Sequence, residues 1–173
     1  MAALIIGPVA YLKPSPKDKR VVALRAAARQ AGLNVSLVRL EDLGAPKHER
    51  VNSAGQPREV FREAAAYGLA HELDGVDEGD SLTIYRNQDE VTLPLHNLNP
   101  DWVVLFRDRD CSWFQPWQER VLNWAQDLPP EVVAIKLDQR FLACCWRENL
   151  AVETGIVATL QEQLSALEKS LSS

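Results

Sequence analysis

The sequence predicts an α/β protein: a three-layer, Rossmann-like or flavodoxin-like fold with a mostly parallel sheet of four core strands, an added β-hairpin and helices on both faces. Two observations favour this class. Short apolar runs alternate along the chain with longer segments of helical periodicity, which is the pattern of βα units. The chain also has 173 residues, of which 46% are hydrophobic, enough for the core of one domain. We expect residues 1–150 to form this domain and residues 151–173 to form a C-terminal amphipathic helix.

The predicted elements begin with a strand, a helix and a second strand. Residues 2–7 are a short apolar run that ends in Gly-Pro, which is typical of a buried strand followed by a turn. Residues 16–31 are expected to form a helix, because Ser15 is a suitable N-cap and Gly32 a suitable C-terminal stop. Residues 33–40 alternate in hydrophobicity and predict the next strand. This order of elements predicts a right-handed crossover between parallel strands.

The middle of the chain predicts a loop, a helix and a hairpin. Residues 43–56 carry Gly, Pro, Asn and Ser without periodicity, so we expect a long surface loop. Residues 57–73 place apolar side chains on one side at helical spacing and predict the second helix. Residues 81–85 and 90–95 flank a short polar stretch, and they predict an antiparallel hairpin.

The last third of the chain supplies the remaining core strands. Residues 102–106 are a clean apolar strand, and a helix is expected from Pro116 to about residue 128. Residues 131–137 predict the fourth core strand. Residues 141–150 are left unassigned, and residues 153–170 predict the final helix.

Charge and cysteine content argue against several classes of protein. The formal net charge is −5, and a negatively charged protein repels nucleic acid, so we expect no nucleic-acid partner. No stretch approaches the roughly 20 apolar residues of a membrane helix, and the first residues lack a basic leader, so we expect a cytoplasmic protein without membrane association. Of the three cysteines, the adjacent Cys144 and Cys145 do not suit a disulfide. They either pack in the core or are reactive.

Motifs that bind cofactors or metals are missing from the sequence. There is no Gly-x-Gly-x-x-Gly after the first strand and no P-loop, so the usual backbone cradles for phosphate are absent. His48, His71 and His96 lie far apart and lack zinc-ligand spacing. The sequence therefore predicts no cofactor, no metal and no catalytic residue.

The strongest candidate ligand site follows the third core strand. Ligands of parallel sheets bind at the carboxyl ends of the strands, and residues 107–112 come directly after this strand. The arginines there would clamp an anion, and the aspartates would hold a metal ion or an amine. The alternative is a solvated loop whose charges neutralise each other. With two residues of the first loop that face the same edge, the ligand-binding candidates are Tyr11, Lys13, Arg107, Asp108, Arg109 and Asp110.

Two apolar stripes are candidate interfaces. Tryptophans cluster around the helix that starts near Pro116, and they either fill the core or bind a partner. The last helix repeats apolar residues at spacings of three and four, which either covers the sheet of the same chain or forms a dimer seam. The interface candidates are Trp113, Trp117, Trp124, Val157, Leu160, Leu164, Leu167 and Leu171.

Two stretches carry a resemblance to a known family. In residues 11–43 a Lys-rich helix start leads through Arg-Gln-Ala-Gly-Leu-Asn into Val-Ser-Leu-Val-Arg-Leu-Glu-Asp-Leu, and residues 99–107 read Asn-Pro-Asp-Trp-Val-Val-Leu-Phe-Arg. This pattern resembles the N-terminal, pre-ATP-grasp domain of ATP-grasp amino-acid ligases of the glutamate-ligase and graspetide-synthetase type. The residues after 150 are too few for the ATP-clamping subdomains of that family. The resemblance therefore implies a recognition or accessory module and assigns no catalytic residue.

Two functional hypotheses follow from the sequence. The preferred one is a non-catalytic binding, accessory or assembly protein that acts through protein-protein contacts and homo-oligomer formation. The alternative is a small enzyme or sensor that binds a nucleotide-like or anionic ligand at the edge formed by residues 107–112.

Overall fold

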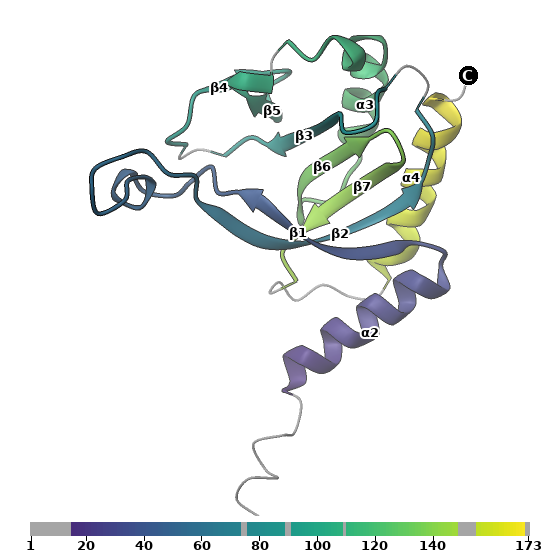
Figure 1. Ribbon diagram of the computed structural model, residues 1–173. Coiled ribbons are helices and arrows are strands. Elements are labelled where there is room, and N and C mark those ends of the chain that lie inside the picture. Colours follow the sequence, from purple (N-terminus) through teal and green to yellow (C-terminus); the bar gives the residue numbers. More distant parts are fainter. Residues whose placement is uncertain (1–14, 74–75, 89–90, 109, 149–154, 172–173) are drawn as a thin grey trace, which may run out of the picture.

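The computed structural model describes residues 15–73, 76–88, 91–108, 110–148 and 155–171 (Figure 1). They form one open sheet of seven strands in the spatial order β1-β2-β7-β6-β3-β5-β4, and every pair of neighbouring strands is antiparallel. The strands are β1 (Asn34–Glu41), β2 (Phe61–Ala70), β3 (Ser81–Arg86), β4 (Leu95–Asn97), β5 (Trp102–Leu105), β6 (Val132–Asp138) and β7 (Phe141–Trp146). The helices are α2 (Pro16–Gln30), α3 (Gln118–Ala125) and α4 (Ile156–Leu171).

The prediction of a mostly parallel, Rossmann-like α/β sheet with four core strands is therefore wrong. It depended on treating residues 57–73 as a helix that crosses over between parallel strands. That segment contains β2, which runs back along β1 and places Ala65 opposite Leu37. Strands joined by a loop without a crossover helix pair antiparallel.

The predicted hairpin is also wrong in its pairing. β3 bonds to β6 on one side and to β5 on the other, whereas β4 pairs with β5. The tight hairpin is formed by β6 and β7, where Asp138 stands opposite Phe141 and its carboxylate accepts the Arg140 N–H at 3.0 Å. Residues 141–150, for which the sequence predicted no element, thus contain β7, a central strand of the sheet.

Several local predictions are confirmed. α2 begins with a capping box, in which the Ser15 hydroxyl accepts the Asp18 N–H and the Asp18 carboxylate accepts the Ser15 N–H. It ends at Gln30, and Gly32 just beyond its C-cap has a φ of 82°, which suits a glycine. The strands expected near residues 33–40, 102–106 and 131–137 are β1, β5 and β6. The strand expected at residues 2–7 lies outside the described residues.

The described helices pack on one face of the sheet, so the prediction of helices on both faces is wrong for this part of the chain. Leu24 of α2, Val121 of α3 and Leu160 of α4 belong to one core cluster with the residues of that face. The opposite face carries small residues such as Ala66, Ala143 and Cys145, and Leu43 from the loop after β1 packs against it. No helix in the described part of the chain is long and apolar enough to cross a membrane.

The two adjacent cysteines point to opposite faces of β7. Cys144 packs in the cluster beneath the helices and Cys145 in the cluster of the other face, and both are fully buried and free. Burial raises the pKa of Cys145 to about 12 and that of Cys144 well above its usual value. Both side chains are therefore neutral thiols that fill the core.

Candidate functional site

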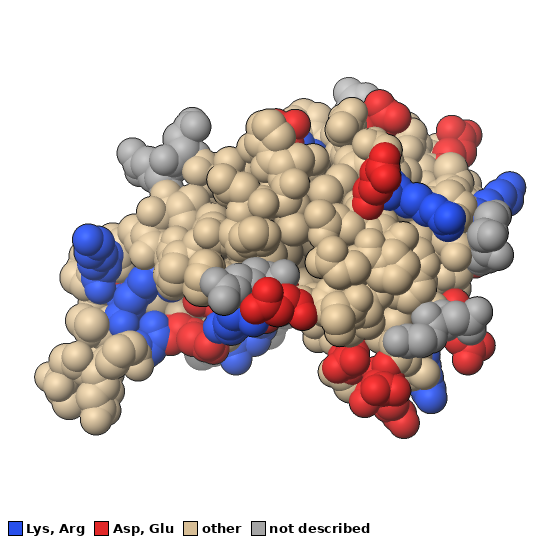
Figure 2. Space-filling model, turned by 90° about the horizontal axis from the view of Figure 1, so that it is seen from above, with Lys and Arg blue, Asp and Glu red and all other residues tan. Residues whose placement is uncertain are grey.

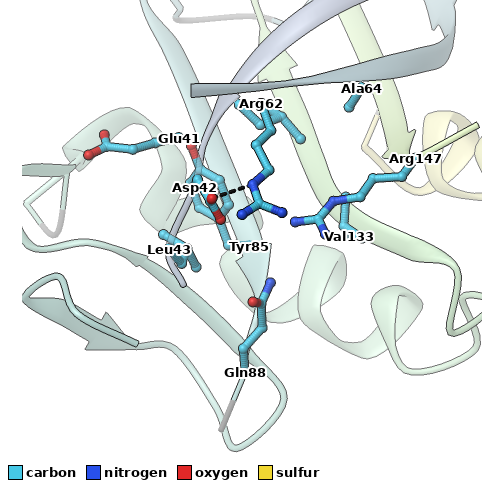
Figure 3. Close-up of a pocket in the computed structure, with 10 residues that line it drawn as sticks. Glu41, Asp42, Leu43, Arg62, Ala64, Tyr85, Gln88, Val133 and Arg147 are labelled. Carbon is cyan, nitrogen blue, oxygen red and sulfur yellow. Dashed lines mark ion pairs between the residues drawn. The ribbon is translucent and has the colours of Figure 1, made fainter. Parts of the chain in front are cut away.

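A small hollow opens on the face of the sheet opposite the helices (Figure 3). Its cavity volume is about 20 Å³, which is room for about one water molecule. Antiparallel pairing places the ends of β1, β3 and β7 beside the starts of β2 and β6, and these five strands are neighbours in the sheet. The lining residues are Leu40, Glu41, Asp42, Leu43, Arg62, Ala64, Tyr85, Gln88, Val133 and Arg147.

Two consecutive carboxylates are buried at the rim of this hollow. Glu41 is 6% exposed and Asp42 4% exposed, and a buried carboxylate needs a cationic partner. Glu41 accepts a hydrogen bond from Arg107 at 3.0 Å and lies 3.5 Å from the Arg50 guanidinium. Asp42 forms an ion pair with Arg62 through Oδ2, although that oxygen accepts no hydrogen bond of good geometry (Figure 3).

Hydrogen bonds from Arg50 and Thr92 hold the loop after β1 in place. Arg50 donates to the backbone carbonyl of Asp42 and, at 2.8 Å, to the hydroxyl of Thr92. That hydroxyl donates in turn to the carbonyl of Ala45 at 2.7 Å. Seen from above, basic and acidic side chains lie together at the end of the molecule from which this loop projects (Figure 2). The network fixes the backbone that presents both rim carboxylates.

Two arginines enter the hollow from different strands. Arg62 extends from β2 and Arg147 follows the end of β7, and their guanidinium groups point toward each other (Figure 3). Arg62 is bound to Asp42. Within the described ranges Arg147 makes no ion pair with a carboxylate. A guanidinium group carries five N–H donors, so the hollow has donors available for a ligand.

Apolar groups form the inner wall of the hollow. Ala64 and Val133 lie beside the ring of Tyr85, which is 7% exposed. Burial raises the pKa of Tyr85 to about 12, against the opposing effect of a backbone hydrogen bond from Glu41. The hydroxyl is therefore uncharged near neutral pH. The hollow therefore combines an apolar inner wall with two arginines and two carboxylates at its rim.

Of the predicted ligand residues, the structure brings Arg107 to the rim of the hollow, where it contacts Glu41. Arg107 contacts Glu41, Glu59 at 2.9 Å and Asp108 at 3.9 Å, so it already has carboxylate partners. Burial raises the pKa of Asp108, with the charge of Arg107 opposing this effect. Asp110 is exposed, and the described residues contain no group of three His, Cys, Asp or Glu that could hold a metal ion. Tyr11, Lys13 and Arg109 lie outside the described residues.

The predicted interface residues lie mostly in the core. Trp124 is buried, and its Nε1 donates to the carbonyl of Gln163 on α4 at 2.7 Å. Trp113 and Trp117 are half-buried, with ring centroids 6.2 Å apart. The apolar seam of α4 packs on the sheet of the same chain, so a partner cannot reach it while α4 stays in place. The seam consists of Val157, Leu160, Leu164, Leu167 and Leu171.

The sequence patterns did not indicate most residues of the hollow as candidates for a site. Arg62 lies in residues 57–73, which the sequence predicts as a helix, and Arg147 lies in residues 141–150, for which it predicts no element. One signal was available: Glu41 and Asp42 directly follow an apolar strand, where a buried acid would require an arginine from elsewhere in the chain. Which arginine pairs with the buried acid depends on the order of the strands in the sheet. The sequence pattern does not give that order.

Comparisons with known proteins identify no family for this chain. No family model and no curated protein matches the chain. Among solved structures, it is similar to the crystal structure of the mycobacterial trehalose monomycolate transport factor A, TtfA, with 13% identity and a TM-score of 0.46 over 89% of this chain and 95% of that chain. A similarity at this level carries no argument about fold or function. The resemblance to the pre-ATP-grasp domain is not tested by these matches and stays a prediction.

Proposed function

We propose that this chain is a non-catalytic binding protein that holds an anionic group at the mouth of the hollow, between Arg62 and Arg147. The observation that supports the proposal is the position of Arg147, which presents a guanidinium group to the hollow without a carboxylate partner in the described structure. Hydrogen bonds between a guanidinium and an anion are charge-assisted and bidentate. A second guanidinium in the same hollow provides further donors.

The test is a calorimetric titration with sodium acetate and sodium phosphate at constant ionic strength. The wild-type protein should bind at least one of these anions saturably, and Arg147→Gln should lose that binding. Arg140→Gln is the matched control, because Arg140 lies in the β6–β7 turn, is exposed, and among the described residues pairs with the exposed Glu78 alone. Binding that persists unchanged in Arg147→Gln, or no saturable binding of either anion by the wild type, would contradict the proposal.

A second candidate function is protein association through β1, whereas the sequence pattern favoured association through the last helix and the tryptophans. β1 is an edge strand of eight residues whose outer side pairs with no strand in the described part of the chain. Leu37 in its middle is 61% exposed. A long edge strand with an exposed apolar side chain is a template for pairing with another strand.

Light scattering tests this second candidate. Leu37→Lys should lower the molar mass of any self-associated species and leave the thermal midpoint unchanged, since the side chain is exposed. Val22→Lys on α2, which replaces another exposed apolar residue, should leave the mass unchanged. If the wild type self-associates and Leu37→Lys has the same molar mass, the β1 edge is not the contact.

A further inference from the structure

A second depression, beside α3, is lined mainly by carboxamide side chains. Five of its seven lining residues are asparagine or glutamine. We infer that this depression binds a neutral sugar, a mono- or disaccharide, through these amide groups. The inference is independent of the proposed function, because the depression shares no lining residue with the hollow of Arg62 and Arg147. The carboxamides are those of Asn99, Gln115, Gln118, Asn123 and Gln126.

The depression lies between α3 and the loop that joins β4 to β5 (Figure 1). α3 packs on the helix-covered face of the sheet, whereas the hollow of Arg62 and Arg147 opens on the opposite face. The volume of the depression is about 370 Å³, and sites for small molecules measure roughly 300–1,000 Å³. The depression therefore has room for a mono- or disaccharide.

Carboxamides are concentrated in this depression. The chain has 16 asparagine and glutamine residues, and five of them line it. Gln118, Asn123 and Gln126 lie on the outer side of α3, a position where the surface of a soluble protein commonly carries charged side chains. This side of α3 thus presents mostly neutral hydrogen-bond donors and acceptors.

The amide groups are available to a ligand. Asn99 is held in place by the backbone, because its Oδ1 accepts the N–H of Asp101 at 3.0 Å and that of Trp102 at 2.8 Å. These two hydrogen bonds fix the Asn99 amide and leave its NH₂ group as a donor. The other four carboxamides make no side-chain hydrogen bond to the described residues. A ligand can therefore bind without displacing a contact of the fold. 

The charge of the lining favours a neutral ligand. Among the described residues that line the depression, Glu119 is acidic and none is Lys, Arg or His. An anion would meet one negative charge and no positive one, so its binding is disfavoured. A single exposed carboxylate binds a cation weakly, because water screens the charge.

Among neutral ligands, a sugar matches the lining best. A hydroxyl donates and accepts hydrogen bonds, and so does a carboxamide. The Glu119 carboxylate can accept hydrogen bonds from two neighbouring hydroxyls, and such bonds are charge-assisted. Leu122, which is 7% exposed, offers an apolar contact to the C–H groups of a sugar ring. A nucleobase is disfavoured, because no aromatic ring among the described lining residues can stack on it.

The experiment is an NMR titration of the full chain that follows the side-chain NH₂ signals of asparagine and glutamine. The probes are the methyl α-glycosides of glucose, galactose and mannose, which carry no charge. At least one of them should shift the NH₂ signals of Gln118 and Gln126 saturably. Because the probe is neutral, its affinity should change less than about twofold between about 50 mM and about 500 mM NaCl.

Two variants test the role of the amides. Gln118→Met and Gln126→Met keep the length and the helix propensity of the side chain but remove its donor and its acceptor. Each should weaken glycoside binding about tenfold. Gln30→Met is the matched control, because Gln30 is an exposed glutamine at the end of α2 and lies outside the depression. It should bind like the wild type, and circular dichroism confirms that each variant is folded.

Four outcomes overturn the inference. The first is that none of the three glycosides shifts these signals saturably, and the second is that both methionine variants bind as the wild type does. The third is that adenosine or sodium acetate binds at these amides more tightly than every glycoside. The fourth is loss of glycoside binding in a folded Arg147→Gln, which would place the sugar in the hollow. Arg147→Gln should instead bind the glycosides like the wild type, so the two sites fail or hold separately.

Discussion

At the scale of single residues, Gly68 of β2 lies close against the neighbouring strand β7. A Cβ atom built there would lie 2.7 Å from the Cβ of Ala143 and closer still to the carbonyl oxygen of Leu142. Leu142 and Ala143 are both fully buried, so neither has room to move. Glycine is required at this position by the closeness of the neighbouring strand.

Gly68→Ala should therefore destabilise the protein by about 1–3 kcal/mol, the usual cost of overpacking a core. Urea denaturation measures the change. Gly155→Ala is the control, because a Cβ at Gly155 would meet nothing within 4 Å. Equal stability of the two variants would show that β2 and β7 are not packed as described.

A second residue-scale feature joins α2 to the sheet. The carboxylate of Glu148 accepts hydrogen bonds from Arg25 at 2.7 Å and from the Tyr67 hydroxyl at 2.8 Å. Burial alone would raise the pKa of Glu148, but the hydrogen bonds from Arg25 and Tyr67, together with the charge of Arg25, lower it below its ordinary value of 4.5. The contact therefore stabilises the fold most when Glu148 is ionised.

The pH dependence of stability tests this contact. Because the pKa of Glu148 is lower in the folded state, its contribution is present above pH 4.5 and is lost as the pH falls through the folded-state value. At pH 7, Glu148→Gln should cost about 2 kcal/mol, and the difference from the wild type should shrink below pH 4.5. Glu78→Gln, at an exposed position, should cost nothing at either pH. A difference that grows in acid would contradict the assignment.

At the scale of elements, the sequence predicts helices best where residues close together in the chain determine their ends and their buried side. The capping box fixes the start of α2 within four residues of sequence, and the apolar spacing of α4 identifies its buried side. β2 was mistaken for a helix because Ala64, Ala65 and Ala66 favour helices in isolation. In the fold these alanines alternate between the two faces of a central strand, and tertiary packing overrides their propensity.

The role of α4 gives the element-scale prediction. Leu164 is fully buried in the core cluster, so Leu164→Ala should cost about 3 kcal/mol through the cavity it leaves. Leu37→Ala, at an exposed position on β1, should change stability by less than about 0.5 kcal/mol. Thermal denaturation measures both. A change of oligomeric mass without loss of stability in Leu164→Ala would show that α4 is an association helix.

At the scale of the whole molecule, the order of the strands creates the candidate site. β7 lies between β2 and β6, and this insertion brings Arg147 to the hollow that Arg62 also lines. The two residues are far apart in the sequence, and no local pattern links them. The sequence placed Arg107 at a ligand-binding edge of a parallel sheet, whereas the antiparallel sheet makes Arg107 the partner of the buried Glu41.

The most direct measurement of the central claim is an NMR titration that follows the Nε–H signals of the arginine side chains. With acetate and phosphate as probes, the signals of Arg147 and Arg62 should shift saturably with at least one of them, while that of Arg25, which is held by Glu148 on the helix-covered side of the sheet, should stay in place. Shifts confined to arginines outside the hollow, or no saturable shift of Arg147, would contradict the assignment of this hollow as an anion-binding site.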